Sequence, residues 1–339
     1  MVQLTGPQQS ATLPPRSVVR TVIGWTMLAG LAAVLAARQL TGTGYTRPPI
    51  GLPDPGGLTA IALPVVGNVR ELAGIAVVGL LFLRVLIPPP VRAVHMHLIE
   101  MTVRWAWGWA GAAAASVLLT LSDMIGVPVT ALPAHLDLVS IVVGTQRVMA
   151  LSATLWIAMA VAFFGNRLAT TSVGSTVVAA LAVAALLPSS LVGHAGHHNF
   201  PLAAVIALAV HVFAAAVWVG GLLGLVTHLR GFPADLRRLV PRFSAVALVC
   251  IAAVGASGVL ESAILLDGWA ALWHSARGHL ILAKCAAICL LAGVGYWHRR
   301  HTVGPASAGL LAPLVRLAMG EVLLMSATVG MAVVLATTA

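Results

Sequence analysis

Only 8% of the 339 residues are charged and 60% are hydrophobic, a composition that excludes a soluble or disordered protein of this length. The formal net charge of +10 does not indicate nucleic-acid binding, because in membrane proteins the excess Lys and Arg collects in cytoplasmic loops. The three cysteines lie inside apolar segments and therefore do not indicate disulfides. We expect an integral membrane protein with no nucleic-acid partner.

The chain begins with a polar, proline-containing segment, residues 1–17, which we expect to be a disordered cytoplasmic leader. A membrane-spanning helix needs about twenty mostly apolar residues, and nine such segments follow the leader, separated by proline-containing connectors. They cover residues 18–37, 66–87, 105–125, 144–165, 172–193, 201–227, 243–266, 276–297 and 311–336. The predicted fold is an all-α, polytopic membrane helix bundle.

The distribution of charge predicts the orientation of this bundle. If the N-terminus is cytoplasmic, most arginines fall on one side of the membrane, and the other side holds Asp54, Asp123, Asp137 and Asp267. Because arginine and lysine favour the cytoplasmic side, we expect a cytoplasmic N-terminus and an extracytoplasmic C-terminus. We expect two parts, an N-terminal four-helix membrane region over residues 18–170 and a five-helix domain over residues 171–339.

Three histidines, His194, His197 and His198, lie together between the fifth and sixth predicted helices, on the predicted extracytoplasmic side. His194 and His197 share a face if the helix continues, because residues three apart are neighbours on a helix. Imidazole suits copper, zinc, nickel and haem iron, and the absence of nearby acidic residues disfavours calcium or magnesium. We interpret the cluster as a metal-capturing site, and the alternative is a polar loop that is rich in histidine.

A fourth histidine, His211, lies about ten residues into the sixth predicted helix, roughly 15 Å from its outer end. An ionisable side chain at that depth normally faces the bundle interior or a polar cavity. Trp218 follows seven residues later and is expected on the same face. We interpret His211 as a second metal ligand, and the alternative is a structural hydrogen bond to a neighbouring helix.

Three further polar residues lie inside predicted helices: Glu261, Lys284 and Glu321. Glu261 and Lys284 are at similar predicted depth and could form an ion pair, whereas Glu321 lies deeper, near the level of His211. A carboxylate at that depth is protonated or paired, so Glu321 is either a structural group or one that balances charge during transport.

Weaker candidates accompany these residues. Cys285 and Cys289 are four apart and share a helix face, where paired thiolates could bind Cu(I), although small residues at this spacing usually pack against another helix. Met325 shares a face with Glu321, and His279 could contribute a second histidine for haem. We interpret five histidines on the predicted cytoplasmic side as interfacial anchors: His95, His97, His228, His298 and His301.

Four motifs in this order resemble the CopD family of copper-resistance membrane proteins, which includes YcnJ-like copper importers and the CopD region of actinobacterial CopD–CtaG fusions. They are His211-Val-Phe-Ala-Ala-Ala-Val-Trp218-Val-Gly220-Gly221, then Arg242-Phe243-Ser244 with Ser257-Gly258, then Gly278-His-Leu-Ile-Leu-Ala-Lys284, and finally Glu321. The resemblance covers about residues 190–336, so residues 171–339 are expected to be a CopD-like domain. One departure is Arg277-Gly278, where the family often has Tyr-Gly.

The resemblance implies a copper-handling protein of the bacterial cytoplasmic membrane that imports copper for homeostasis or delivery to cuproenzymes. It also implies a CopC-like chaperone or a CtaG-like oxidase assembly protein as partner. Two alternatives remain: a b-type haem protein in which two histidines hold the haem, and an assembly factor that delivers copper to cytochrome c oxidase. The sequence contains no Walker motif and no zinc-protease or esterase motif, so we expect a transporter or metal-binding protein and not an enzyme.

Overall fold

The computed structural model describes residues 16–42, 45, 48–49, 52–87, 92–168, 171–194, 202–229, 231–265, 269–301 and 311–335. These residues are helical, with no strand among them, which confirms the predicted all-helical fold. The long helices are α1 (Arg16–Leu40), α2 (Gly56–Leu86), α3 (Arg92–Ile125), α5 (Gln146–Leu168), α6 (Ser172–His194), α7 (Leu202–Ala215), α9 (Pro233–Leu265), α11 (Ala276–His301) and α13 (Leu311–Leu335). Helix α7 continues through the π-helical turn η2 (Ala216–Gly220) into α8 (Gly221–Thr227), and η1 (Val129–Ala134), α4 (Leu136–Val142) and α10 (Trp269–His274) are short helices in the connections.

Within the described residues, six helices are long and apolar enough to cross a membrane: Arg20–Leu40, Ala93–Ile125, Gln146–Leu168, Leu202–Thr227, Ala234–Ala263 and Gly278–Trp297. The apolar stretches Val173–Pro188 in α6 and Ala318–Val334 in α13 are shorter. Helix α2, which carries Arg70, Glu71 and Arg84, is not one of the six. The protein therefore has the helices of a membrane protein, and the number of nine spans and the orientation stay predictions.

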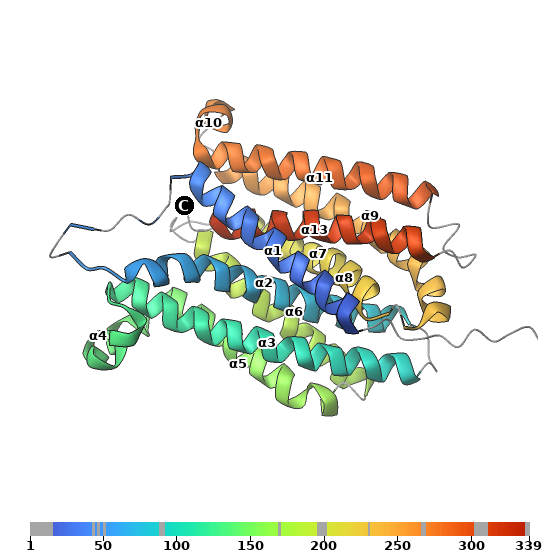
Figure 1. The fold of residues 1–339 in the computed structure, drawn as a ribbon, viewed down its shortest axis with the longest axis horizontal. Helices are drawn as coiled ribbons and strands as arrows, with labels where there is room; N and C mark the ends of the chain where they lie inside the picture. The colour runs from blue at the N-terminus through green and yellow to red at the C-terminus, as the bar shows by residue number, and fades with distance from the viewer. Residues whose placement is uncertain are drawn as a thin grey trace, which may run out of the picture.

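The long helices run side by side along the long axis of the molecule, with α4 and α10 at the same end (Figure 1). This end, where α1 ends and α2 begins, has Asp54, Asp123 and Asp137, and we call it the acidic end. The opposite end, where α2, α8 and α11 end and α9 begins, has arginines on several helices, and we call it the basic end. These arginines include Arg20, Arg84, Arg237, Arg238 and Arg300.

Helix α2 lies at the centre of the bundle and contacts α3, α6, η2, α8 and α13. Every residue from Leu72 to Leu81 is buried, as expected for a helix that is apolar on all sides. A Cβ atom on Gly79 would lie 2.0 Å from the carbonyl carbon of Gly220, and one on Gly220 would lie 2.0 Å from the Ile75 oxygen. The backbones of α2 and η2 are therefore in direct contact, as at other membrane helix interfaces that use small residues.

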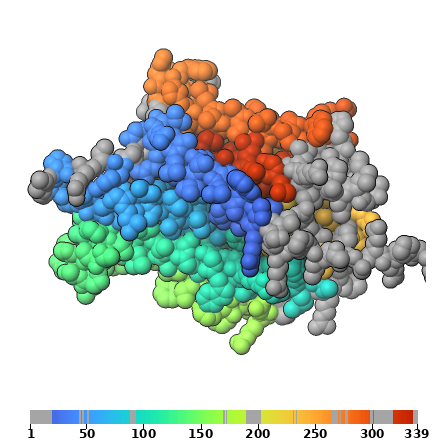
Figure 2. All heavy atoms as spheres, in the orientation of Figure 1, coloured from blue at the N-terminus to red at the C-terminus, as the bar shows by residue number. Residues whose placement is uncertain are grey.

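The first and last long helices pack against each other. Figure 2 shows α1 beside α13 on one face of the molecule. The contact depends on Gly330, where a Cβ would lie 2.4 Å from the Gly30 oxygen, and on Ser326, whose hydroxyl donates to the Thr26 carbonyl at 2.6 Å. Helix α6 packs mainly against α5 and α2. Helices from the two predicted parts of the chain are thus interleaved in one bundle.

We expect Gly79→Ala to destabilise the folded protein, because the added methyl group has no room against Gly220 and would separate α2 from η2. Overpacking of this kind costs about 1–3 kcal/mol. The measurement is unfolding of the purified protein in detergent. Gly108→Ala is the matched control, since Gly108 is exposed on α3 with no atom within 4 Å of a built Cβ, and there alanine should be neutral or stabilising. Equal stability of the two variants would contradict the backbone contact.

Candidate functional site

His211 is held by a serine on the neighbouring helix α9. Its Nδ1 atom lies 3.1 Å from the Ser257 hydroxyl oxygen. That hydroxyl donates its proton to the Ala253 carbonyl at 2.6 Å, so the hydroxyl oxygen acts as acceptor for His211. In this arrangement Nδ1 donates its proton to Ser257, a hydrogen bond of the kind that orients metal-binding histidines.

The residue after this serine also faces the imidazole ring. A Cβ on Gly258 would lie 3.5 Å from Cε1 of His211 and 3.7 Å from its Nδ1, which is ordinary contact distance. An alanine would therefore fit here, whereas a longer side chain would reach the imidazole. Ser257 and Gly258 thus form one surface against His211.

The π-helical turn η2 begins five residues after His211 and contains Trp218. All five residues of η2 are buried, and π turns inside α-helices are frequent at functional sites. A Cβ on Gly221, directly after η2, would lie 2.3 Å from the Phe243 ring. The Trp-Val-Gly-Gly motif thus packs against the Arg-Phe-Ser motif of α9, although more than twenty residues separate them in the sequence.

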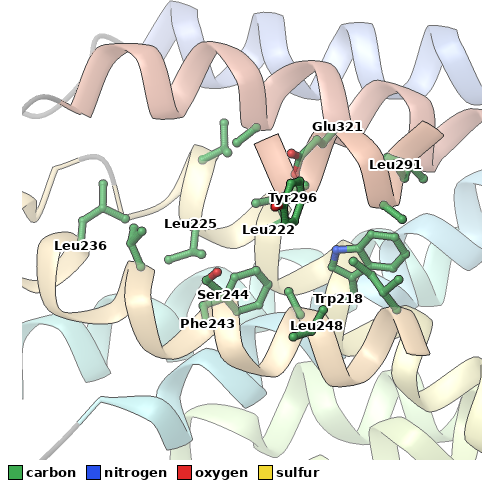
Figure 3. A pocket seen from close by; sticks show the side chains of 17 residues that line it. Trp218, Leu222, Leu225, Leu236, Phe243, Ser244, Leu248, Leu291, Tyr296 and Glu321 are labelled. Carbon is green, nitrogen blue, oxygen red and sulfur yellow. The ribbon is translucent and has the colours of Figure 1, made fainter. Parts of the chain in front are cut away.

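A cavity of about 320 Å³ lies between α8, α9, α11 and α13. Its lining is largely apolar, and the side chains of Trp218, Ser244, Tyr296 and Glu321 supply polar groups (Figure 3). Glu321 reaches the cavity from α13 and is only 7% exposed. His211 is not part of the lining. The face that His211 and Trp218 are predicted to share stays a prediction.

Glu261 on α9 and Lys284 on α11 interact electrostatically. Both side chains are partly buried, and each lies toward the acidic end of its helix. His279, one turn before Lys284, is exposed, and its Nε2 lies 2.9 Å from the Trp273 carbonyl oxygen. The Glu261–Lys284 ion pair stays a prediction, and His279 contacts the short helix α10.

The predicted outer cluster falls largely outside the described residues. His194 is the last residue of α6, but its side chain is not described, and neither are His197 and His198. Among the residues whose placement is described, no group of three or more His, Cys, Asp or Glu side chains is close enough to hold a metal ion. The metal role of these three histidines stays a prediction.

The sulfur-containing candidates have different surroundings. Cys285 and Cys289 are both exposed on α11, so within this chain they neither pack against another helix nor line the interior. Met325 is 1% exposed in the main core, one turn after Glu321. Of the three, Met325 is the one inside the bundle.

The sequence interpretation missed a histidine pair at the basic end. The Trp105 indole on α3 donates a hydrogen bond to Nε2 of His228 at 3.0 Å, and the His97 and His228 rings lie 6.2 Å apart, centre to centre. Burial, together with the smaller effects of the charges of His97 and Arg104, lowers the pKa of His228 to about 4. The ring is therefore neutral at physiological pH. More than one hundred residues separate His97 from His228, and no local pattern connects them.

Comparison with known proteins gives one match. Residues 237–335 match the family model CopD, copper resistance protein D. The match confirms the resemblance for this segment, and it contains Ser257, Glu261, Lys284 and Glu321. It is shorter than the predicted range of 190–336 and begins after His211 and Trp218. No curated protein and no solved structure matches the chain.

The lowered pKa of His228 predicts a loss of stability in mild acid. The unfolded chain binds a proton at this residue near pH 6.5, whereas the folded protein does so only near pH 4. Stability is therefore complete above pH 6.5 and declines as the pH falls toward 4, by on the order of 3 kcal/mol. His228→Gln keeps an acceptor for Trp105 but cannot be protonated. We expect a flatter decline of melting temperature between pH 7 and 4.5 for this variant, and parallel curves would contradict the assignment.

Proposed function

We propose that this protein imports copper across the bacterial cytoplasmic membrane, for homeostasis or for delivery to cuproenzymes. The observation that carries the proposal is the His211–Ser257 pair, in which a serine hydroxyl orients an imidazole ring inside a helix bundle. Imidazole is a good ligand for copper, and a hydrogen-bond partner on the second ring nitrogen is typical of metal-binding histidines. The match of residues 237–335 to copper resistance protein D supports copper as the metal.

The proposed route starts at His194, His197 and His198. These histidines lie at the end of α6 and directly after it, and we propose that they capture copper from the extracytoplasmic side. His211 then receives the ion about ten residues into α7. Ser257 does not contact the metal in this scheme: it holds the ring so that Nε2 faces the ion.

The next residue in the proposed route is Glu321, whose buried carboxyl group lines the cavity. We propose that it balances the charge of the ion or carries a proton. Met325, buried one turn away on α13, is the soft ligand closest to it in the sequence. We leave Cys285 and Cys289 out of the route because both are exposed on the outside of α11. A CopC-like chaperone or a CtaG-like oxidase assembly protein would exchange copper with the protein on the extracytoplasmic side.

His211→Ala should abolish copper import, because it removes the proposed ligand inside the bundle. The measurement is the copper content of cells that express equal amounts of each variant, determined by mass spectrometry of the metal. Ser257→Ala should have a weaker effect and raise the copper concentration needed for half-maximal import about 10–100-fold. His279→Ala is the control, since His279 is exposed at the start of α11. Normal import by His211→Ala would remove His211 from the route.

The triple variant His194→Ala, His197→Ala and His198→Ala tests the entry site separately. If these residues only capture the ion, their loss should raise the copper concentration required for import and leave the maximal rate at high copper unchanged. The matched control is His135→Ala, a histidine of the acidic end in the connection between η1 and α4. An unchanged copper dependence of the triple variant would contradict capture by this cluster.

A further inference from the structure

We propose that the cavity between α9 and α11 binds one acyl chain of an anionic phospholipid, whose phosphate is held by Arg237 and Arg300 at the basic end. His211 does not line this cavity, and of the residues in the proposed copper route only Glu321 does. The proposal rests on three observations: the shape of the cavity, the surface onto which it opens and the charge at its rim.

The cavity is long and narrow. On α9 its lining runs from Leu236 to Ile251, a separation of fifteen positions that covers about 22 Å of helix axis. Figure 3 shows the labelled side chains distributed along this direction, with Leu236 at one end and Trp218 and Leu291 at the other. Because a volume of about 320 Å³ is spread over that length, the cavity has a narrow cross-section and the shape of a tube. An unbranched hydrocarbon chain fits a tube of this kind, whereas a broad planar ring system does not.

The cavity opens at the lipid-facing surface. Two of its lining residues, Leu248 on α9 and Tyr296 on α11, are 57% and 61% exposed. Their neighbours Val249 and Leu290 are also exposed apolar side chains within the candidate membrane spans. A molecule that enters between α9 and α11 must therefore come from the hydrocarbon phase, and its apolar part is already inside the membrane.

Arginines lie where this opening approaches the basic end. Arg237 is exposed and lies seven residues before Ser244 and eleven before Leu248, so it shares their face of α9. The Arg300 guanidinium carbon lies 5.3 Å from the centre of the Tyr296 ring. Asp235, two residues before Arg237, is on the opposite face of α9. Two cations beside an apolar tube match a phosphate joined to an acyl chain, and basic pockets between helices bind such head groups.

The test uses the purified full-length protein after removal of lipid in detergent. Phosphatidylglycerol and phosphatidylcholine with identical acyl chains are added in turn, and lipid binding is followed by native mass spectrometry and by the melting temperature. We expect phosphatidylglycerol to bind saturably at roughly tenfold lower concentration than phosphatidylcholine. Equal binding of the two lipids by the wild-type protein would overturn the proposal.

Two pairs of variants separate the head-group site from the tube. Arg237→Gln with Arg300→Gln should remove the preference for phosphatidylglycerol, whereas Arg238→Gln, on the other face of α9, should retain it. Gly295→Leu should abolish binding of both lipids, because Gly295 lines the cavity and no atom lies within 4 Å of a built Cβ. Gly293→Leu is its matched control, since Gly293 is exposed and equally unobstructed but does not line the cavity.

Three results would overturn the proposal. They are wild-type lipid binding by Gly295→Leu, a retained preference in the double arginine variant, and stoichiometric extraction of an isoprenoid quinone in place of a phospholipid. Copper import is not measured in this experiment, so its outcome and that of the proposed function are independent.

Discussion

The arrangement of this bundle depends on the contact between Gly79 on α2 and Gly220 on η2. Within a membrane, lipid tails solvate apolar side chains as well as another helix does, so helices associate through close packing of small residues. Here the two backbones touch, and no side chain larger than hydrogen fits at either glycine. The same turn directs Trp218 into the cavity and brings Gly221 against Phe243. The contact with α2 therefore determines the orientation in which η2 packs against α9.

Helix α9 contacts His211 and lines the cavity at different positions along its axis. Ser257 and Gly258 form the surface against His211, whereas Leu236, Ser244 and Ile251 line the cavity. Gly258 lies seven residues after Ile251 and therefore on the same face of the helix, so the two contacts are separated along the axis. One helix can thus contribute to both the proposed metal site and the proposed lipid site.

The all-helical fold could be predicted from the sequence because apolar segments are local signals, whereas α2, α3 and α9 begin ten or more residues before their predicted starts. The partner of His211 was predicted only as part of a family motif. The contact between His211 and Ser257 requires α7 and α9 to lie side by side, and the hydrophobic periodicity of the sequence does not determine which helices are neighbours. The π turn was not predicted, since it depends on the packing against α2. The pair of His97 and His228 was missed for a similar reason: it joins two helices that are distant in the sequence.

The polar residues of α2 complete the description of the membrane interior. Helix α2 and the α7–α8 helix both run from the acidic end to the basic end, and Gly79 is opposite Gly220. Arg70 precedes Gly79 by nine residues and His211 precedes Gly220 by nine, so the two lie at about the same depth. Arg70 is paired with Glu71 at 2.7 Å.

An unpaired guanidinium at that depth would repel a metal cation bound to His211. Because the adjacent carboxylate neutralises it, the level of the bundle that contains the proposed metal ligand carries no net charge from α2. Packing alone does not require this ion pair, because an apolar helix would pack equally well. A buried ion pair has an energetic cost, and its presence is therefore consistent with a requirement for polar groups at this depth.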